Sequence, residues 1–181
     1  MTDAIEINGR RLELTIGDIT REQVDAIANA ANASLRGGGG VDGAIHRAAG
    51  PELMAELWRR YPEGTPTGTA VETSAGRLPA KWVLHAVGPR WRGGAHGEGE
   101  RLASAYRSCL RLADELRATS LAFPAISLGI YGYPLDEGAR VALETVAEHL
   151  RGETTLRLVR FVLRPDTYPA FERALESLAA E

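Results

Sequence analysis

The chain has 181 residues, of which 44% are apolar and 25% charged; this composition is typical of one globular domain over residues 1–181 and not of a disordered chain. Its net charge of −3 disfavours general nucleic-acid binding, because proteins of that class usually carry a basic excess. The one cysteine, Cys109, excludes an intrachain disulfide and a cysteine-rich zinc site. The N-terminal residues show neither a signal peptide nor a membrane-spanning apolar run, so we expect a cytoplasmic protein.

Strands and short helices are predicted to alternate in the first half of the chain. Alternating apolar and polar residues predict a strand, and apolar residues at helical spacing predict a helix. In chain order the patterns predict an edge strand within residues 1–11, a strand over 12–16, a short helical turn over 20–23, a buried strand over 24–28, a helix over 41–49 and a second helix from Pro51.

The second half of the chain continues this mixture. The predicted elements are strands over 69–73 and 81–87, a helix over 102–113, a strand over 121–125, a turn-rich loop over 126–134, a helix over 139–150, a strand over 156–163 and a helix over 168–178. We therefore predict an α/β fold, a three-layer sandwich in which a mixed β-sheet is flanked by helices on both faces. Ligands in such folds bind beyond the carboxyl ends of strands, which makes loops 17–20, 29–43 and 126–134 the candidate site.

Residues 37–43, four glycines followed by Val-Asp-Gly, form the most unusual segment. Backbone amides of a glycine-rich loop at a helix N-terminus can surround a phosphate, because no Cβ blocks its approach. The plainer alternative is a flexible linker, but a strand precedes the loop and a helix follows it. The segment also matches the dinucleotide-binding pattern of spaced glycines. Residues 29–36 separate it from the strand, which argues against that assignment, and no P-loop lysine follows.

Polar side chains on either side of this loop have two interpretations each. Asp42 is either a residue that caps the helix or a carboxylate that acts as a general base beside a phosphate site. His46, four residues later, shares its helix face and is either a packing residue or a supporting one. Asn29 and Asn32 are either turn residues or amides that hold sugar hydroxyls.

The loop over residues 127–134 is the second candidate ligand loop. It is either an ordinary connection or a segment whose glycines let backbone amides converge on a diphosphate, with Ser127 and two tyrosines adding hydroxyls. Asp18, after the first predicted strand, is either a cap or an acceptor for an exocyclic amine such as that of adenine.

Six segments spread over almost the whole chain form an ordered set of motifs. They are Gly17-Asp18-Ile19-Thr20, Asn29-Ala30-Ala31-Asn32, Gly37 to Gly43 with Ala44-Ile45-His46, Leu78-Pro79-Ala80-Lys81, His85 with Val87-Gly88-Pro89, and Phe123-Pro124-Ala125-Ile126-Ser127 with residues 129–134. From about Leu12 to the C-terminus this set resembles the macrodomain family, and most closely its branch of O-acetyl-ADP-ribose deacetylases and ADP-ribosyl ester hydrolases.

The resemblance implies an ADP-ribose cleft on the crest of the sheet. It assigns Asp18 and the Ile19 amide to adenine, Asn32 to the distal ribose, Gly40, Val41 and Asp42 to the distal ribose and phosphate, and the backbone amides of Ser127, Leu128, Gly129, Ile130 and Tyr131 to the diphosphate. Asp42 would be the catalytic acid–base residue with Asn32 as its partner. No metal and no cofactor are implied.

Two positions depart from the family pattern. Leu128 stands where a threonine is usual, which matters only if the hydroxyl of that residue binds the ligand. Arg164 stands where many members stack an aromatic ring on adenine. It is either a stacking guanidinium or a solvated charge at a strand end.

The resemblance thus predicts a metal-independent hydrolase of ester-linked ADP-ribose. Its substrates would be O-acetyl-ADP-ribose and proteins mono-ADP-ribosylated on acidic side chains, with water attacking either the acyl carbonyl or the anomeric carbon. The alternatives are an ADP-ribose reader without turnover and a hydrolase of ADP-ribosylated nucleic acid. The acidic charge balance counts against the nucleic-acid substrate, and no membrane partner is expected.

Overall fold

The computed structural model describes residues 3–181, which form seven strands, five α-helices and one 3₁₀ turn. In chain order they are β1 (Ala4–Ile7), β2 (Arg10–Ile16), η1 (Ile19–Arg21), β3 (Ala26–Ala31), α1 (Gly40–Ala49), α2 (Pro51–Arg60), β4 (Ala70–Ser74), β5 (Trp82–Val87), α3 (Glu98–Glu115), β6 (Ser120–Phe123), α4 (Leu135–Arg151), β7 (Leu158–Leu163) and α5 (Tyr168–Ala179).

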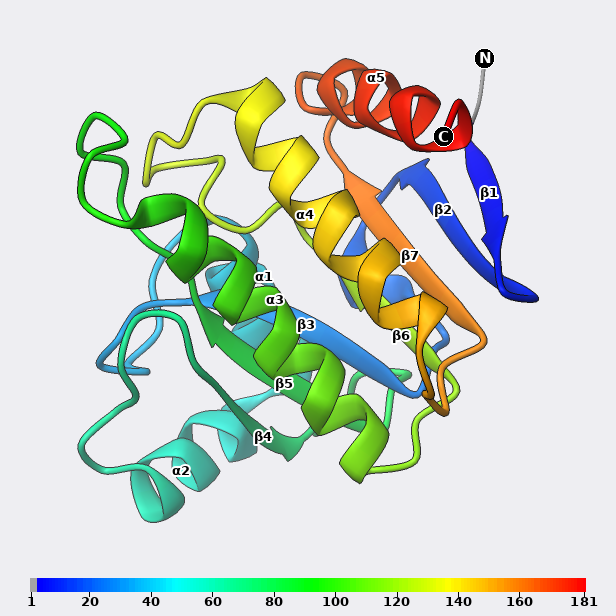
Figure 1. Ribbon diagram of the computed structural model, residues 1–181. Helices are drawn as coiled ribbons and strands as arrows, with labels where there is room; N and C mark the ends of the chain where they lie inside the picture. Colours follow the sequence, from blue (N-terminus) through cyan, green and yellow to red (C-terminus); the bar gives the residue numbers. More distant parts are fainter. Residues whose placement is uncertain (1–2) are drawn as a thin grey trace.

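All seven strands belong to one mixed sheet in the order β1-β2-β7-β6-β3-β5-β4 (Figure 1). The five inner strands, from β2 to β5, are parallel to their neighbours, and the edge strands β1 and β4 are antiparallel. The carboxyl ends of five strands therefore meet at one edge of the sheet, and that edge carries all three candidate loops.

Helices cover both faces of the sheet, as predicted. Figure 1 shows α3 and α4 in front of it, and these helices with α5 close a large core around Tyr106, Phe123 and Phe161. Helices α1 and α2 pack on the other face, against β3 and β4 respectively. A smaller core on that side includes Ile27 and Val83, which lie on alternate positions of β3 and β5 from the residues of the large core.

Two local predictions are wrong in detail. The buried strand runs from residue 26 to 31 rather than from 24 to 28, so Asn29 lies inside β3 and not in a turn. The turn near residue 20 is a 3₁₀ turn whose cap is Asp18, since the Asp18 carboxylate accepts the Thr20 amide; the Thr20 capping box does not form. The other predicted elements are present with ends shifted by a few residues.

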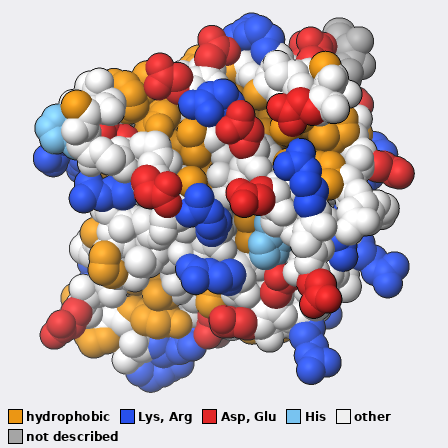
Figure 2. Space-filling model, in the orientation of Figure 1, with side chains coloured by type: hydrophobic (Ala, Val, Ile, Leu, Met, Phe, Trp, Pro, Cys, Tyr) orange, Lys and Arg blue, Asp and Glu red, His pale blue; other side chains and the backbone are white. Residues whose placement is uncertain are grey.

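Basic and acidic side chains are interspersed on the face shown in Figure 2. Over residues 3–181 no helix is both long and apolar enough to cross a membrane.

Candidate functional site

The glycine loop reaches the sheet edge between β3 and α1 and is held from both ends. Asn32 donates its amide to the Gly37 carbonyl at 2.8 Å and accepts the Ser34 hydroxyl, which closes the first part of the loop. A Cβ at Gly43 would lie 2.6 Å from the Gly38 carbonyl, so only glycine lets the loop pack on α1. Gly39 is the N-cap and offers no side chain, so the first amides of α1 have no side-chain cap.

Asp42 lies in the first turn of α1 and is buried, with one carboxylate oxygen close to two neighbours. Its Oδ1 accepts the Asn29 amide at 2.7 Å, and His46 Nε2 lies 3.3 Å from the same oxygen. Among residues 3–181 no hydrogen-bond donor to Oδ2 is found. This second oxygen faces the glycine loop, because a Cβ at Gly38 would lie 3.6 Å from it.

The direct partner of Asp42 is Asn29 rather than Asn32. The Asn32 amide, 3.9 Å from the same Gly38 Cβ position, lies near the Oδ2 side of the carboxylate instead. The two asparagines of the Asn-Ala-Ala-Asn motif thus approach Asp42 from different directions. Asn29 does so from inside the sheet, and Asn32 from the loop.

A buried polar chain continues behind Asn29. Its amide also lies 3.1 Å from His85 Nδ1, and His85 Nε2 lies 2.9 Å from the Thr73 hydroxyl. Burial, and secondarily the charge of nearby His46, lower the pKa of His85 to about 3, so this ring is neutral in the folded protein. Thr73 was not identified from sequence; the only signal is its place on a predicted strand.

The second loop follows β6 and has an unusual backbone. Ser127 has φ 70°, in the left-handed region, and its buried hydroxyl has no partner within the described chain. A Cβ at Gly88 would lie 2.2 Å from that hydroxyl, so glycine is needed there for the two loops to touch. The amides of Gly129 and Ile130, like that of Tyr131, find no acceptor within residues 3–181.

Leu128 turns inward from this loop. Its side chain is buried and packs on Gly138 in the first turn of α4, where a Cβ would lie 2.4 Å from Leu128 Cδ1. Its amide bonds the Ala125 carbonyl at 3.4 Å. Ile130, in contrast, is 91% exposed at the tip of the loop.

The segment after β5 supports the second loop from outside. Trp91 donates its amide to the Tyr131 carbonyl at 2.9 Å, and its ring packs on Tyr133 with centroids 4.8 Å apart. Glu98, at the start of α3, holds this segment in turn, because its buried carboxylate accepts three backbone amides, those of Arg92, Gly94 and His96. Burial alone raises the pKa of Glu98, but these amides outweigh it and lower the pKa to about 2.

Asp18 and Arg164 lie at adjacent strand ends, since Gly17 after β2 donates its amide to the Leu163 carbonyl at the end of β7. The Thr20 hydroxyl and amide lower the pKa of Asp18, which leaves an ionised acceptor; Ile19 beside it is buried. The exposed Arg164 guanidinium pairs with Asp166, through contacts of 3.2 and 3.0 Å.

No cluster of three or more His, Cys, Asp or Glu side chains suited to a metal ion is present in the described part of the chain. Cys109 is buried in the large core, and burial raises the pKa of its thiol, which makes it an inert packing residue.

Comparisons with known proteins agree with this architecture. A macro domain-containing protein of Caldanaerobacter subterraneus is 52% identical over 171 residues, covering 93% of this chain and 97% of that protein. An O-acetyl-ADP-ribose deacetylase of Salmonella gallinarum is 56% identical over 154 residues, covering 84% and 86%.

Two solved structures are similar in shape as well as in sequence. The Oceanobacillus iheyensis macrodomain with ADP has a TM-score of 0.92 at 42% identity and covers 98% of this chain and 96% of its own. The Trypanosoma brucei macrodomain in complex with ADP-ribose has a TM-score of 0.84 at 40% identity, covering 91% and 68%. The family model of the Macro domain matches residues 28–142, and the chain belongs to this family.

Proposed function

We propose that this protein binds ADP-ribose and hydrolyses its esters, with Asp42 as the general base. The observation that carries the proposal is the asymmetry of the Asp42 carboxylate. One oxygen accepts the Asn29 amide and lies beside His46, and the other faces the glycine loop without a donor from the described chain. Relatives named O-acetyl-ADP-ribose deacetylase and neighbours solved with ADP or ADP-ribose support the same conclusion.

The ligand would lie along the sheet edge, across the ends of four strands. Asp18 would accept the adenine amine beside the Ile19 amide, with Arg164 over the ring. The unpaired amides of residues 129–131 would bind the diphosphate. The Leu128 amide already donates to the Ala125 carbonyl. We therefore expect Leu128 to make the weakest contact with the diphosphate among the residues of this loop.

The distal ribose would then reach the glycine loop. Asn32 would bind its hydroxyls, and Gly40, Val41 and Asp42 would line it at the uncapped start of α1. Asp42 Oδ2 would take a proton from water as the water oxygen bonds to the attacked carbon of the ester. The C–O bond between the acyl group and the ribose would then break, and the proton on Asp42 would pass to the leaving oxygen, which gives a carboxylic acid and ADP-ribose. The diphosphate contacts fix the ribose against this water, which is an orientation effect. No cofactor takes part.

Two matched variants separate binding from chemistry. Asp42→Ala should reduce hydrolysis of O-acetyl-ADP-ribose by about 10²–10⁴-fold, the usual contribution of a general base, while ADP-ribose affinity is largely kept. Asp18→Ala should do the reverse: loss of a charged hydrogen bond worth about 1.5–3 kcal/mol weakens binding about tenfold to a hundredfold. Product release and calorimetry measure the two quantities.

Three results would redirect the proposal. Wild-type binding without any turnover would make the protein a reader of ADP-ribose. Full turnover by Asp42→Ala would place the base elsewhere, and chelator-sensitive turnover restored by a divalent ion would replace the metal-independent mechanism. With a protein ADP-ribosylated on glutamate, isotopically labelled water shows the point of attack. The label enters the carboxylate if the acyl carbonyl is attacked, and the ribose if the anomeric carbon is.

A further inference from the structure

Three neighbouring strands present one polar side chain each to the α1 and α2 face of the sheet. Asn29 on β3 is the direct register partner of His85 on β5, and β4 brings Thr73 next to them. All three side chains are fully buried. A buried polar group without a partner costs about 1–3 kcal/mol of stability. We therefore ask where each donor hydrogen of these three side chains goes.

The hydrogen bonds have one consistent direction, set by the Asp42 carboxylate. A carboxylate only accepts, so the Asn29 group facing it at 2.7 Å is the amide nitrogen. The second hydrogen of that nitrogen points to His85 Nδ1, which must therefore be unprotonated. The ring proton is then on Nε2 and donates to the Thr73 hydroxyl.

Thr73 completes the chain. Its hydroxyl accepts from His85 at 2.9 Å and donates its own hydrogen to the Ser74 carbonyl at 2.9 Å. Protonation of His85 would set a ring N–H against the Asn29 amide hydrogens, which agrees with the neutral state of this buried ring. Each donor from Thr73 to Asn29 is thus used.

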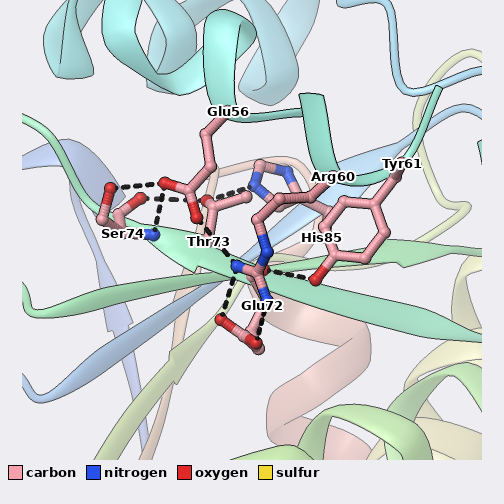
Figure 3. A network of polar contacts seen from close by, with 7 residues as sticks. All are labelled: Glu56, Arg60, Tyr61, Glu72, Thr73, Ser74 and His85. Carbon is pink, nitrogen blue, oxygen red and sulfur yellow. Dashed lines mark hydrogen bonds and ion pairs between the residues drawn. The ribbon is translucent and has the colours of Figure 1, made fainter. Parts of the chain in front are cut away.

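The Thr73 end of this chain of hydrogen bonds is fixed by α2, as Figure 3 shows. Glu56 accepts the amide and hydroxyl of Ser74, and Arg60 binds Glu56 and Glu72 together. These contacts hold the edge strand β4, and with it Thr73, against the helix.

We propose that His85 is a positioning residue, which Thr73 holds in its neutral form with the proton on Nε2. His85 fixes the orientation of the Asn29 amide, and this amide in turn orients the Asp42 carboxylate. The buried chain then keeps Oδ2 directed at the glycine loop. The link to turnover rests on the proposed function of Asp42; the hydrogen-bond directions do not.

The test compares two substitutions of Thr73 in the full chain. Thr73→Val keeps the shape of the side chain and removes its hydroxyl, and Thr73→Ser restores the hydroxyl. Thr145→Val is the control, because Thr145 is also a buried threonine and its hydroxyl donates to a backbone carbonyl, that of Val141 in α4, away from His85. Long-range proton–nitrogen NMR reports the His85 tautomer and the Asn29 amide shift, and steady-state kinetics reports kcat and KM.

We expect wild type and Thr73→Ser to show a proton on His85 Nε2 and none on Nδ1. Thr73→Val should move the Asn29 amide resonances and lower kcat about threefold to tenfold, because His85 Nε2–H loses its buried acceptor, with KM and ADP-ribose affinity unchanged. Thr145→Val should change neither. In an Asp42→Asn background, Thr73→Val should have no further effect on turnover.

Three outcomes overturn the proposal. They are a proton on His85 Nδ1, an Asn29 amide that ignores Thr73→Val, and a kcat lost equally in Thr73→Val and Thr145→Val. If wild type turns over no ester at all, the proposed function fails. The two NMR results still decide whether the hydrogen bonds between Thr73, His85 and Asn29 have the direction described.

Discussion

Asn29 and Asn32 show how differently two identical residues in one motif are used. Asn29 is enclosed by the sheet and gives both amide hydrogens to Asp42 and His85, whereas Asn32 is half-buried and closes the glycine loop. From the sequence each is either a turn residue or a sugar-binding amide, and the family resemblance makes Asn32, not Asn29, the partner of Asp42. Strand propensity disfavours asparagine, so a pattern based on single residues cannot find one whose partners lie 13 and 56 positions away.

Arg164 offers a test at the same scale. If its guanidinium covers adenine, Arg164→Ala should lose about 0.5–2 kcal/mol of ADP-ribose affinity, by analogy with cation–π contacts, and Arg164→Tyr should keep or improve it. Arg164→Lys should not restore it, because an ammonium has no plane to stack. Calorimetry with ADP-ribose measures these changes, and ribose 5-phosphate, which lacks adenine, is the control ligand.

Asp166 refines that experiment, since it pairs with the Arg164 guanidinium. Asp166→Ala should weaken ADP-ribose binding less than Arg164→Ala, because the ring contact survives while the pairing of the guanidinium is lost. Equal affinity for all the Arg164 variants would leave Arg164 as a solvated charge.

Elements were more predictable than the contacts between them. The order of strands and helices follows from apolar spacing, and the family resemblance locates the three loops. The register that sets Asn29 opposite His85 depends on long-range pairing, and the left-handed Ser127 depends on its contact with Gly88. Glu98 gave no signal, because a carboxylate in a first helical turn is ordinary in sequence.

The contact between the loops after β5 and β6 can be tested with Gly88→Ala. The new methyl would lie 2.2 Å from Ser127 Oγ and 2.5 Å from Ile126 Cγ2, so these two side chains of the second loop must shift. We expect ADP-ribose affinity to fall about tenfold or more, of the order of one charged hydrogen bond. Gly99→Ala is the control, because its methyl would make only an ordinary contact of 3.7 Å with Tyr133. Unchanged calorimetric affinity in Gly88→Ala would separate this contact from the ligand site.

At the scale of the whole molecule, two buried groups, His85 and Glu98, contribute to the response to acid in different pH ranges. The pKa of His85 is about 3 in the folded protein and about 6.5 in the unfolded chain, so the unfolded chain binds the extra proton and stability falls as the pH drops below about 6.5. The pKa of Glu98 is about 2 when folded and 4.5 when unfolded. Its contribution is present above about 4.5 and is lost as the pH falls toward 2.

Urea unfolding across this range separates the two groups. His85→Gln should be less stable near neutrality but lose less stability between about pH 6.5 and 4.5 than wild type, because its side chain takes up no proton. Glu98→Gln should flatten only the decline below about 4.5. His96→Gln, at an exposed position, should follow wild type. Parallel curves for wild type and His85→Gln would contradict the buried neutral ring.

The meeting of five strand ends at one edge has a thermodynamic consequence. A ligand lying across four of them would touch segments from residue 18 to residue 164, after β2, β3, β6 and β7, and these segments are held side by side only while the sheet is intact. Binding energy would therefore be linked to global unfolding, with about 2.7 kcal/mol of added stability at a hundred times the dissociation constant. The free energy of unfolding would therefore rise with occupancy of this edge of the sheet.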